Sequence, residues 1–174
     1  MNKGNMVKVS HLNISNNLPF TLIAGPCVIE SKDHALETAQ KIASITKKLN
    51  IQFIYKSSFD KANRTSLNSE RGPGLNLSLE IFDAIKSTIG CPVITDVHEI
   101  SQLELISKVV DIIQIPAFLC RQTDLLIEAA KTNKPVIAIS GGSYKAKAIK
   151  AAIEGGLING LITDEDTVKK ILNG

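Results

Sequence analysis

The sequence of 174 residues contains no tryptophan, and aromatic residues make up only 4% of it. The aromatic platforms on which proteins stack single-stranded nucleic acid are therefore missing. The net charge is only +3, from 20 Lys and Arg against 17 Asp and Glu, and the excess is spread along the chain. Because nucleic-acid-binding surfaces concentrate many cations on one face, neither observation favours a nucleic-acid partner.

Cysteines and long apolar runs are also scarce. Cys27, Cys91 and Cys120 are odd in number, widely spaced and set in apolar runs, which is typical of a reducing compartment and not of a disulfide framework. No segment reaches the roughly 18 uninterrupted apolar residues of a membrane span, and the N-terminus shows no apolar leader. We therefore expect a soluble, cytoplasmic protein that does not bind membranes.

The sequence does contain a regular alternation of short β-branched runs and longer stretches with helical periodicity. Several runs are apolar on both faces, which is typical of parallel strands covered by helices. We expect an N-terminal strand or hairpin at 7–14, turned at Asn16-Asn17. The six core strands are expected at 20–24, 51–55, 93–95, 112–115, 136–139 and 160–163. Helices are expected from Ser31 to about 45, at 77–88, at 101–107, at 123–132 with Thr123 as its cap, at 144–154, and from 164 or 166 to 172.

These elements predict a single α/β domain over residues 1–174 with a six-stranded parallel sheet. Its closure is the open question, since an eight-stranded barrel needs two more βα units. An open, doubly wound Rossmann-like sheet is favoured over a partial TIM barrel, because a barrel without a quarter of its wall would expose two long edges.

The segment YKSSFDKANRTS (residues 55–66) carries the strongest functional signal. It places Lys56, Lys61 and Arg64 among hydroxyl and amide side chains, directly after the apolar run at 51–54. Cations at the C-terminal end of a parallel strand are well placed to bind a phosphorylated ligand. A solvated basic loop is the alternative interpretation.

Five motifs in order carry a family resemblance. They are IAGPCVIES (23–31), YKSSFDKANRTS (55–66), RGPGL (71–75), PVITDVHE (92–99) and IQIPAFLCRQTDLL (113–126). Together they resemble the 3-deoxy-D-manno-octulosonate-8-phosphate synthases, enzymes of lipopolysaccharide biosynthesis in the wider 3-deoxyheptulosonate-type aldol synthase family. The resemblance marks residues 1–136 as a barrel-synthase-like segment, with its motifs between about 22 and 136.

The resemblance implies a transferase that condenses phosphoenolpyruvate with arabinose 5-phosphate and releases phosphate. By the same resemblance, Lys56, Ser58 and Lys61 would hold phosphoenolpyruvate. The sugar phosphate would meet Asn63, Arg64 and Thr65. Further substrate-binding residues would line the sugar site, with the last of them near a subunit boundary: Asp96, Gln114, Pro116, Ala117, Phe118 and Arg121.

Cys27 resembles the cysteine that binds a divalent metal in one class of these synthases. The other metal ligands of that class lie in the half of the family pattern that does not follow here, and one soft ligand makes no site. We therefore expect Cys27 to be an inert buried thiol and expect no cofactor. His98 and Glu99 are adjacent, so they would point to opposite faces of a strand and do not form a metal pair.

Residues 137–174 depart from the synthase pattern. The stretch GGSYKAKAIKAAIEGGLINGLITDE resembles the end of the sugar-phosphate-binding effector domain of SorC/DeoR-type transcriptional regulators. The chain therefore resembles a chimera joined near Pro135, natural or engineered. The glycines and the helix that follows predict a second phosphate site, formed by Gly141, Gly142, Ser143 and Lys145, with a plain strand-to-helix turn as the alternative.

Three functions compete on these grounds. The favoured one is a synthase-derived hybrid that binds phosphate or sugar phosphate without turnover, because catalytic groups are missing. The second is an active synthase completed by another chain. The third is a sugar-phosphate-sensing module, which would need a DNA-binding partner. Assembly into a homo-oligomer stays open.

Overall fold

The computed structural model describes residues 6–15, 17–61, 71–158 and 160–173. Its centre is a parallel sheet of four strands, which pair in the order β3 (Thr21–Ala24), β4 (Gln52–Lys56), β5 (Val93–Asp96) and β6 (Ile112–Gln114). Two more strands, β7 (Ile137–Ile139) and β8 (Gly160–Ile162), form a separate parallel pair. A bridge between Ile113 and Val136 links the two sheets. The six parallel strands are present as predicted, but they form a four-stranded and a two-stranded sheet and not one sheet of six.

The helices follow the strands as the periodicity predicted. They are α1 (Lys32–Lys48), α2 (Leu75–Ile89), α3 (Ile100–Val109), α4 (Thr123–Lys131), α5 (Ala146–Glu154) and α6 (Glu165–Asn173). Short 3₁₀ turns, η1 (Ala117–Leu119) and η2 (Ser143–Lys145), precede α4 and α5. Ser31 caps α1, since its Oγ accepts from the N–H of His34 at 3.2 Å. The predicted cap at Thr123 is wrong, because this residue is the first in α4 and follows an N-cap at Gln122.

The two faces of the central sheet are distinct. Phe53 and Tyr55 of β4 and Val93 of β5 belong to the main core, which α1, α2 and α3 cover. The alternate residues Ile54, Ile94 and Ile112 face the other way and form a second, smaller core. Because side chains alternate along a strand, every second residue of β4, β5 and β6 lies on this inner face.

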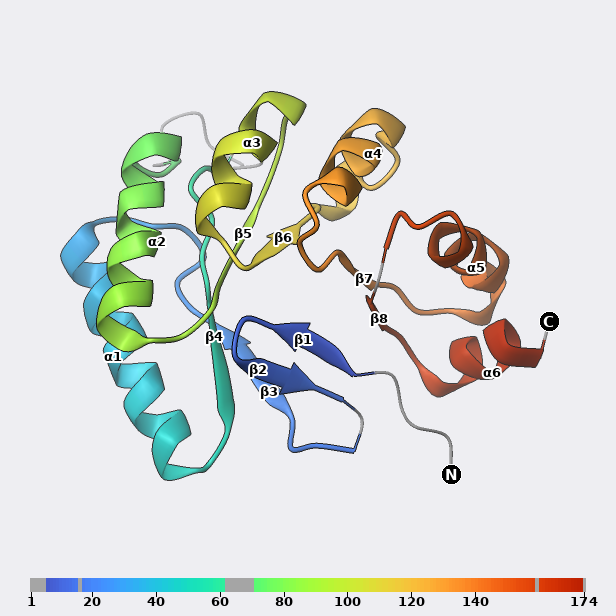
Figure 1. Cartoon of the computed structure of the whole chain (residues 1–174), viewed down its shortest axis with the longest axis horizontal. Helices are drawn as coiled ribbons and strands as arrows, with labels where there is room; N and C mark the ends of the chain where they lie inside the picture. The colour runs from blue at the N-terminus through green and yellow to red at the C-terminus, as the bar shows by residue number, and fades with distance from the viewer. Residues whose placement is uncertain (1–5, 16, 62–70, 159, 174) are drawn as a thin grey trace.

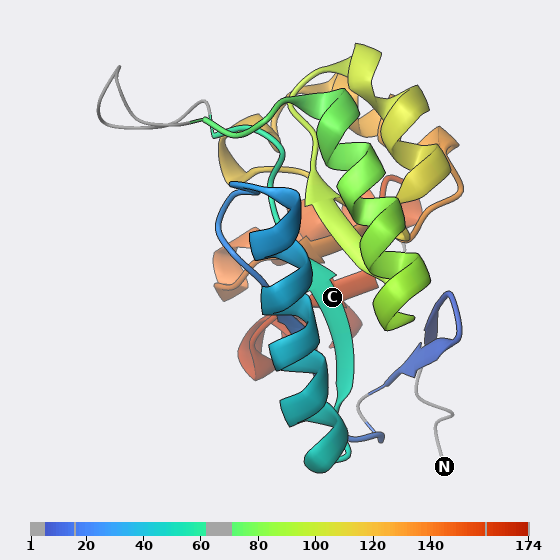
Figure 2. The same cartoon turned by 90° about the vertical axis from the view of Figure 1, so that its left-hand side faces the viewer.

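The strand order contradicts the predicted doubly wound sheet. A doubly wound sheet reverses its order at a switch point and carries helices on both faces. Here the order is sequential, and α1, α2 and α3 stand in one row beside the sheet (Figures 1 and 2). Sequential parallel strands with all helices outside are the arrangement of a (β/α) barrel wall. The chain therefore has the topology of a partial barrel.

An N-terminal hairpin lies against the inner face. Strands β1 (Val7–Val9) and β2 (Leu12–Ile14) pair antiparallel, as expected, and the turn between them lies at Ser10-His11. Asn16 of the predicted turn lies outside the described residues. Val9 is fully buried and packs with the inner-face residues of β4, β5 and β6. The hairpin, drawn in dark blue in Figure 1, thus closes the interior at one end of the sheet.

The opposite flanks of this wall are open in the part of the chain that the structure describes. The outer edges of β3 and β8 pair with no described strand. A hollow of about 680 Å³ lies between them. Its apolar lining includes Leu18, Phe20, Ile23, Ile137, Ile153, Leu161 and Ile162. The exposed sheet edges that were expected to disfavour a partial barrel are therefore present.

Candidate active site

Three polar residues extend the inner face at the C-terminal ends of neighbouring strands. Lys56, Asp96 and Gln114 each stand two positions after an apolar inner-face residue, namely Ile54, Ile94 and Ile112. The strand register places these side chains on the same face, since Asp96 pairs with Gln114, and Lys56 pairs with the inner-face residue Ile94. The inner face therefore changes from apolar, under the hairpin, to polar at the end where parallel sheets place their ligand sites.

The loops after β3 and β4 are tied together at this end. Ser57 Oγ donates to the carbonyl of Pro26 at 2.9 Å, and the Ser58 N–H donates to the carbonyl of Cys27 at 3.3 Å. Gly25 makes this approach feasible, because any Cβ there would overlap the carbonyl oxygen of Lys56. Ser57 and Ser58 are fully buried. The backbone that carries Lys56 is consequently fixed against its neighbour strand.

Lys56 is a partly buried cation among other charges. Its Nζ donates to Ser58 Oγ at 3.4 Å. Burial lowers the pKa of the Lys56 ammonium, the Asp96 carboxylate opposes this shift, and the nearby Lys61 ammonium adds to it. Two neighbouring lysines, one of them partly desolvated, form a site whose electrostatic energy improves when an anion binds.

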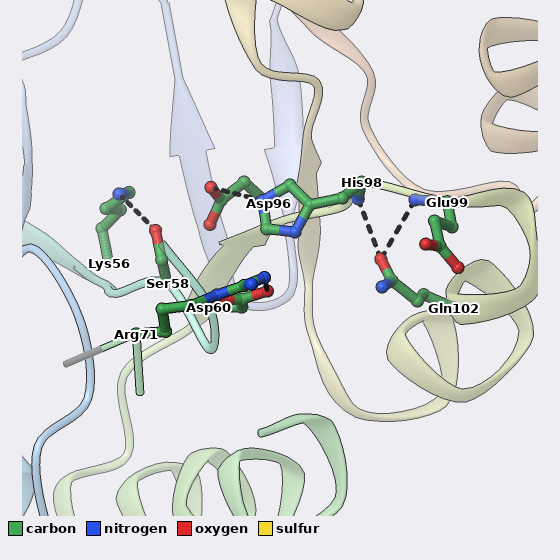
Figure 3. Close-up of polar contacts among 8 residues, drawn as sticks. All are labelled: Lys56, Ser58, Asp60, Arg71, Asp96, His98, Glu99 and Gln102. Atoms are coloured by element: carbon green, nitrogen blue, oxygen red, sulfur yellow. Dashed lines mark hydrogen bonds and ion pairs between the residues drawn. The ribbon is translucent and has the colours of Figure 1, made fainter. Parts of the chain in front are cut away.

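Asp96 and His98 form a second polar pair beside the lysine. The His98 Nε2 and Asp96 Oδ2 atoms are 3.3 Å apart (Figure 3). The other carboxylate oxygen of Asp96 is buried and has no hydrogen-bond partner among the described residues. The amide oxygen of Gln102 accepts from the N–H groups of His98 and Glu99, at 2.8 and 3.1 Å. The loop after β5 is therefore held rigidly, while one buried acceptor is left for a donor from a ligand.

An ion pair joins the two ends of the loop that follows β4. Arg71 binds Asp60 through two hydrogen bonds, of 2.8 and 2.5 Å. The arginine holds the pKa of the Asp60 carboxyl below its usual range, and the charge of His98 acts in the same direction. Lys61 lies next to this pair and donates its N–H to the carbonyl of Arg71 at 2.8 Å. The predicted sugar-phosphate residues Asn63, Arg64 and Thr65 lie outside the described residues.

The remaining predicted residues follow β6. Gln114 and Pro116 are partly buried near the end of the strand, and the Gln114 carbonyl accepts from the N–H of Val97 at 3.0 Å. Ala117 and Phe118 lie on the turn η1, where the Phe118 side chain is 85% exposed, and Arg121 is also exposed. The structure thus brings Lys56, Lys61 and Asp96 together but leaves these η1 residues at the surface.

Comparison with known proteins places this sequence in a family. The sequence matches the DAHP synthetase I family over residues 5–173, nearly the whole chain. The chain belongs to the DAHP synthetase I family. It is 58% identical to the 2-dehydro-3-deoxyphosphooctonate aldolase of Rickettsia prowazekii (strain Madrid E) over 141 residues, which are 81% of this chain and 51% of that protein. The proteins of the same name from Rickettsia felis (strain ATCC VR-1525 / URRWXCal2) and Bartonella henselae (strain ATCC 49882 / DSM 28221 / CCUG 30454 / Houston 1) are 56% and 55% identical over the same length.

This DAHP synthetase I chain spans about half the length of the curated relatives that it matches. The family match continues through residues 137–173. The comparisons therefore give no support to a regulator-derived C-terminal segment or to a fusion near Pro135. None of the described helices is both long and apolar enough to cross a membrane.

The expected burial of Cys27 is wrong. The residue is exposed in the loop after β3, as is Cys120 after η1, and only Cys91 is buried. The chain leaves β3 after Ala24, and Cys27 is exposed in the loop although the next two residues, Val28 and Ile29, are buried. Within the described residues, no group of three or more His, Cys, Asp or Glu side chains could hold a metal ion.

The predicted phosphate site in the C-terminal segment is already occupied by a carboxylate, that of Asp164. The Gly142 N–H donates to Asp164 Oδ2 at 2.7 Å, and Asp164 also accepts from the N–H and hydroxyl of Thr167 as the cap of α6. A phosphate at Gly141, Gly142 and Ser143 would meet this negative charge. Lys145 instead lies over the ring of Tyr144, 5.4 Å from its centroid. The geometry favours the strand-to-helix turn, which the sequence left as the alternative.

Two features of the site were not given a role by the sequence argument. His98 was considered only as a metal ligand, although its spacing of two from Asp96 predicts that both side chains lie on one face. Asp60 and Arg71 were not paired, because the residues between them hide their proximity in a linear sequence. The signal that could have found this pair is the opposite charge at the two ends of one polar loop.

Proposed function

We propose that this chain carries the phosphoenolpyruvate-binding part of a 2-dehydro-3-deoxyphosphooctonate aldolase-type site, and that the chain alone binds this ligand without turnover. The reaction of such a site is the condensation of phosphoenolpyruvate with arabinose 5-phosphate, with release of phosphate. The observation that carries the proposal is the cluster of Lys56, Lys61 and the half-satisfied Asp96 at the polar end of the inner face.

The cluster supplies the groups that a small, doubly anionic ligand needs. Lys56 and Lys61 offer two cationic donors, and Ser58 offers a hydroxyl beside Lys56. The free oxygen of Asp96 suits a hydroxyl donor of a sugar, with His98 beside the other oxygen. Binding an anion here returns to Lys56 part of the stabilisation that its ammonium loses on burial.

A titration tests the proposal. The purified chain is titrated with phosphoenolpyruvate and arabinose 5-phosphate, with and without divalent metal, while the thermal midpoint and phosphate release are followed. We expect phosphoenolpyruvate to raise the thermal midpoint, because a ligand at one hundred times its Kd stabilises the folded chain by about 2.7 kcal/mol. We expect no phosphate release. Lys56→Met is expected to lose the rise.

The matched control is Lys108→Met, which removes an exposed lysine that pairs with Glu104 on α3, a helix of the outer face. It should keep the full midpoint rise. An equal rise in the wild type and in Lys56→Met would refute the proposed site. Steady phosphate release by the chain alone would refute the absence of turnover.

A second candidate function, an active enzyme completed by another polypeptide, is favoured by the open edges of β3 and β8 and by the apolar hollow between them. A polypeptide that supplies parallel βα units would pair both edges and fill this hollow. Co-expression with the C-terminal half of the Rickettsia prowazekii relative tests it. Co-purification with phosphate release would support the candidate, and two polypeptides that fail to associate would refute it.

A further inference from the structure

The ion pair between Asp60 and Arg71 lies at the neck of the loop after β4. The two guanidinium hydrogen bonds to Asp60 are of the bidentate kind, which fixes orientation as well as distance. The adjacent Lys61 N–H donates to the carbonyl of the same arginine. Asp60, Lys61 and Arg71 therefore form a closed set of contacts between the two ends of the loop, which we call the clasp.

The backbone beyond the clasp leaves little freedom for another arrangement. Gly72 has φ +117°, in the region that favours glycine. A Cβ there would lie 2.5 Å from the carbonyl oxygen of Phe59 and 2.8 Å from Val28 Cγ2. The backbone before the clasp, at Phe59, and the backbone after it, at Gly72, are thus packed on each other. The position of Arg71 relative to Asp60 is set by this packing as well as by charge.

The clasp stands directly beside the proposed anion site. Lys56 Nζ donates to Ser58 Oγ at 3.4 Å, and Ser58 stands two residues before Asp60, the first residue of the clasp. The Lys61 ammonium also lowers the pKa of Lys56. The Asp60 carboxylate is near enough to His98 for the imidazole charge to lower its pKa. Figure 3 shows the Asp60–Arg71 pair near both the Lys56–Ser58 contact and the Asp96–His98 pair.

We infer that the Asp60–Arg71 clasp is a positioning device, which holds Lys61 beside Lys56 so that both ammonium groups meet one phosphorylated ligand. The inference rests on the anion site proposed above. Neither Asp60 nor Arg71 needs to touch the ligand, because a carboxylate paired with a guanidinium carries almost no net charge. Breaking the clasp leaves Lys61 in the chain but no longer in a fixed place.

A double-mutant cycle in phosphoenolpyruvate affinity, measured by calorimetry, tests this role. We expect Asp60→Asn, Arg71→Met and Lys61→Met each to weaken binding about tenfold, as loss of one charged contact does. Adding Lys61→Met to Asp60→Asn should cost less than threefold more, because Lys61 is already out of place. A structural role that only stabilises the fold predicts additive losses instead.

The matched control is Glu37→Gln, which breaks an exposed ion pair with Lys41 on α1, on the covered face of the sheet. It should leave affinity unchanged. Fully additive losses in the cycle would overturn the clasp, and so would an Asp60→Asn variant that binds phosphoenolpyruvate as the wild type does.

Amide hydrogen exchange separates failure of the clasp from failure of the proposed function. The Lys61 N–H is hydrogen-bonded to the Arg71 carbonyl, so it should be protected in the wild type without ligand. Protection should fall in Asp60→Asn and in Arg71→Met but not in Glu37→Gln. A wild type that binds no phosphoenolpyruvate refutes the proposed function, while unchanged Lys61 protection in both clasp variants refutes the clasp.

Discussion

Replacing Gly25 by alanine should test how closely the loops that carry the site are packed. Gly25 follows β3 and lies against the backbone of Lys56. A Cβ at this position would overlap the Lys56 carbonyl oxygen and lie 3.0 Å from its carbonyl carbon. Real Cβ atoms essentially never approach another atom more closely than 3.0 Å. Because the obstacle is backbone and not a flexible side chain, the two strand ends must separate.

The expected cost follows from overpacking that the site cannot relieve by a rotamer change. Such insertions cost about 1–3 kcal/mol, and we expect Gly25→Ala at the upper end, about 3 kcal/mol. The smaller unfolded-state entropy of alanine offsets roughly 0.4–1 kcal/mol of this. For a domain of this size a net loss of 2–3 kcal/mol lowers the thermal midpoint by roughly 4–12 °C.

Gly160→Ala is the matched control. Gly160 begins β8, and a Cβ there would lie 3.1 Å from Cγ1 of Ile137, a side-chain atom that can move. We expect a change of less than about 1 kcal/mol. The assay is thermal denaturation of both variants, followed by far-ultraviolet circular dichroism. A Gly25→Ala midpoint within 2 °C of the wild type by the thermal scan, or an equal loss in both variants, would refute the reasoning.

Further predictions concern ion pairs and pH. Lys86→Met should lower the free energy of unfolding by about 2 kcal/mol, because the partly buried Lys86 Nζ donates to the carbonyl of Val109 at 2.8 Å and to Asp111 at 3.1 Å. Lys108→Met, which breaks an exposed ion pair, should lower it by less than about 0.5 kcal/mol. Equal losses in urea denaturation would contradict this. The Gly142 N–H and the Thr167 groups hold the pKa of Asp164 at about 2, below its unfolded value of about 3.9. The stabilisation that the Asp164 carboxylate provides is therefore complete above about pH 4 and is lost as pH falls toward 2. The unfolding midpoint of Asp164→Asn should therefore depend less on pH over this acid range than that of the wild type.

Most of the secondary structure could be predicted because each element has its own periodic signal. The six core strands and the six helices lie where the alternation of apolar runs placed them. The strand order could not be predicted from that signal, because a run such as VITDV is apolar on both faces in a doubly wound sheet and in a barrel wall alike. The expectation that exposed edges would be avoided then led to the wrong choice.

The site was only partly accessible to the same reasoning. Lys56 and Asp96 could be placed because each directly follows an apolar strand run, and the ends of parallel strands meet at one edge. Cys27 was misplaced because an apolar run does not show where the chain leaves the sheet. The carboxylate at Gly142 could not be foreseen either, since Asp164, which accepts from the Gly142 N–H, lies on the following βα unit. Roles for Gln114, Pro116 and Phe118 stay predictions.

The sequential order of β3, β4, β5 and β6 also bears on how this wall is made during synthesis. Each strand pairs with the strand that the ribosome produces next, and the helix between them is already in place. Pairing between strands that are neighbours along the chain closes a shorter loop than pairing between distant strands would, and so costs less loop-closure entropy. The sheet can therefore grow by one βα unit at a time from the N-terminus, with the hairpin that precedes it ready to cover the first inner-face residues as they appear.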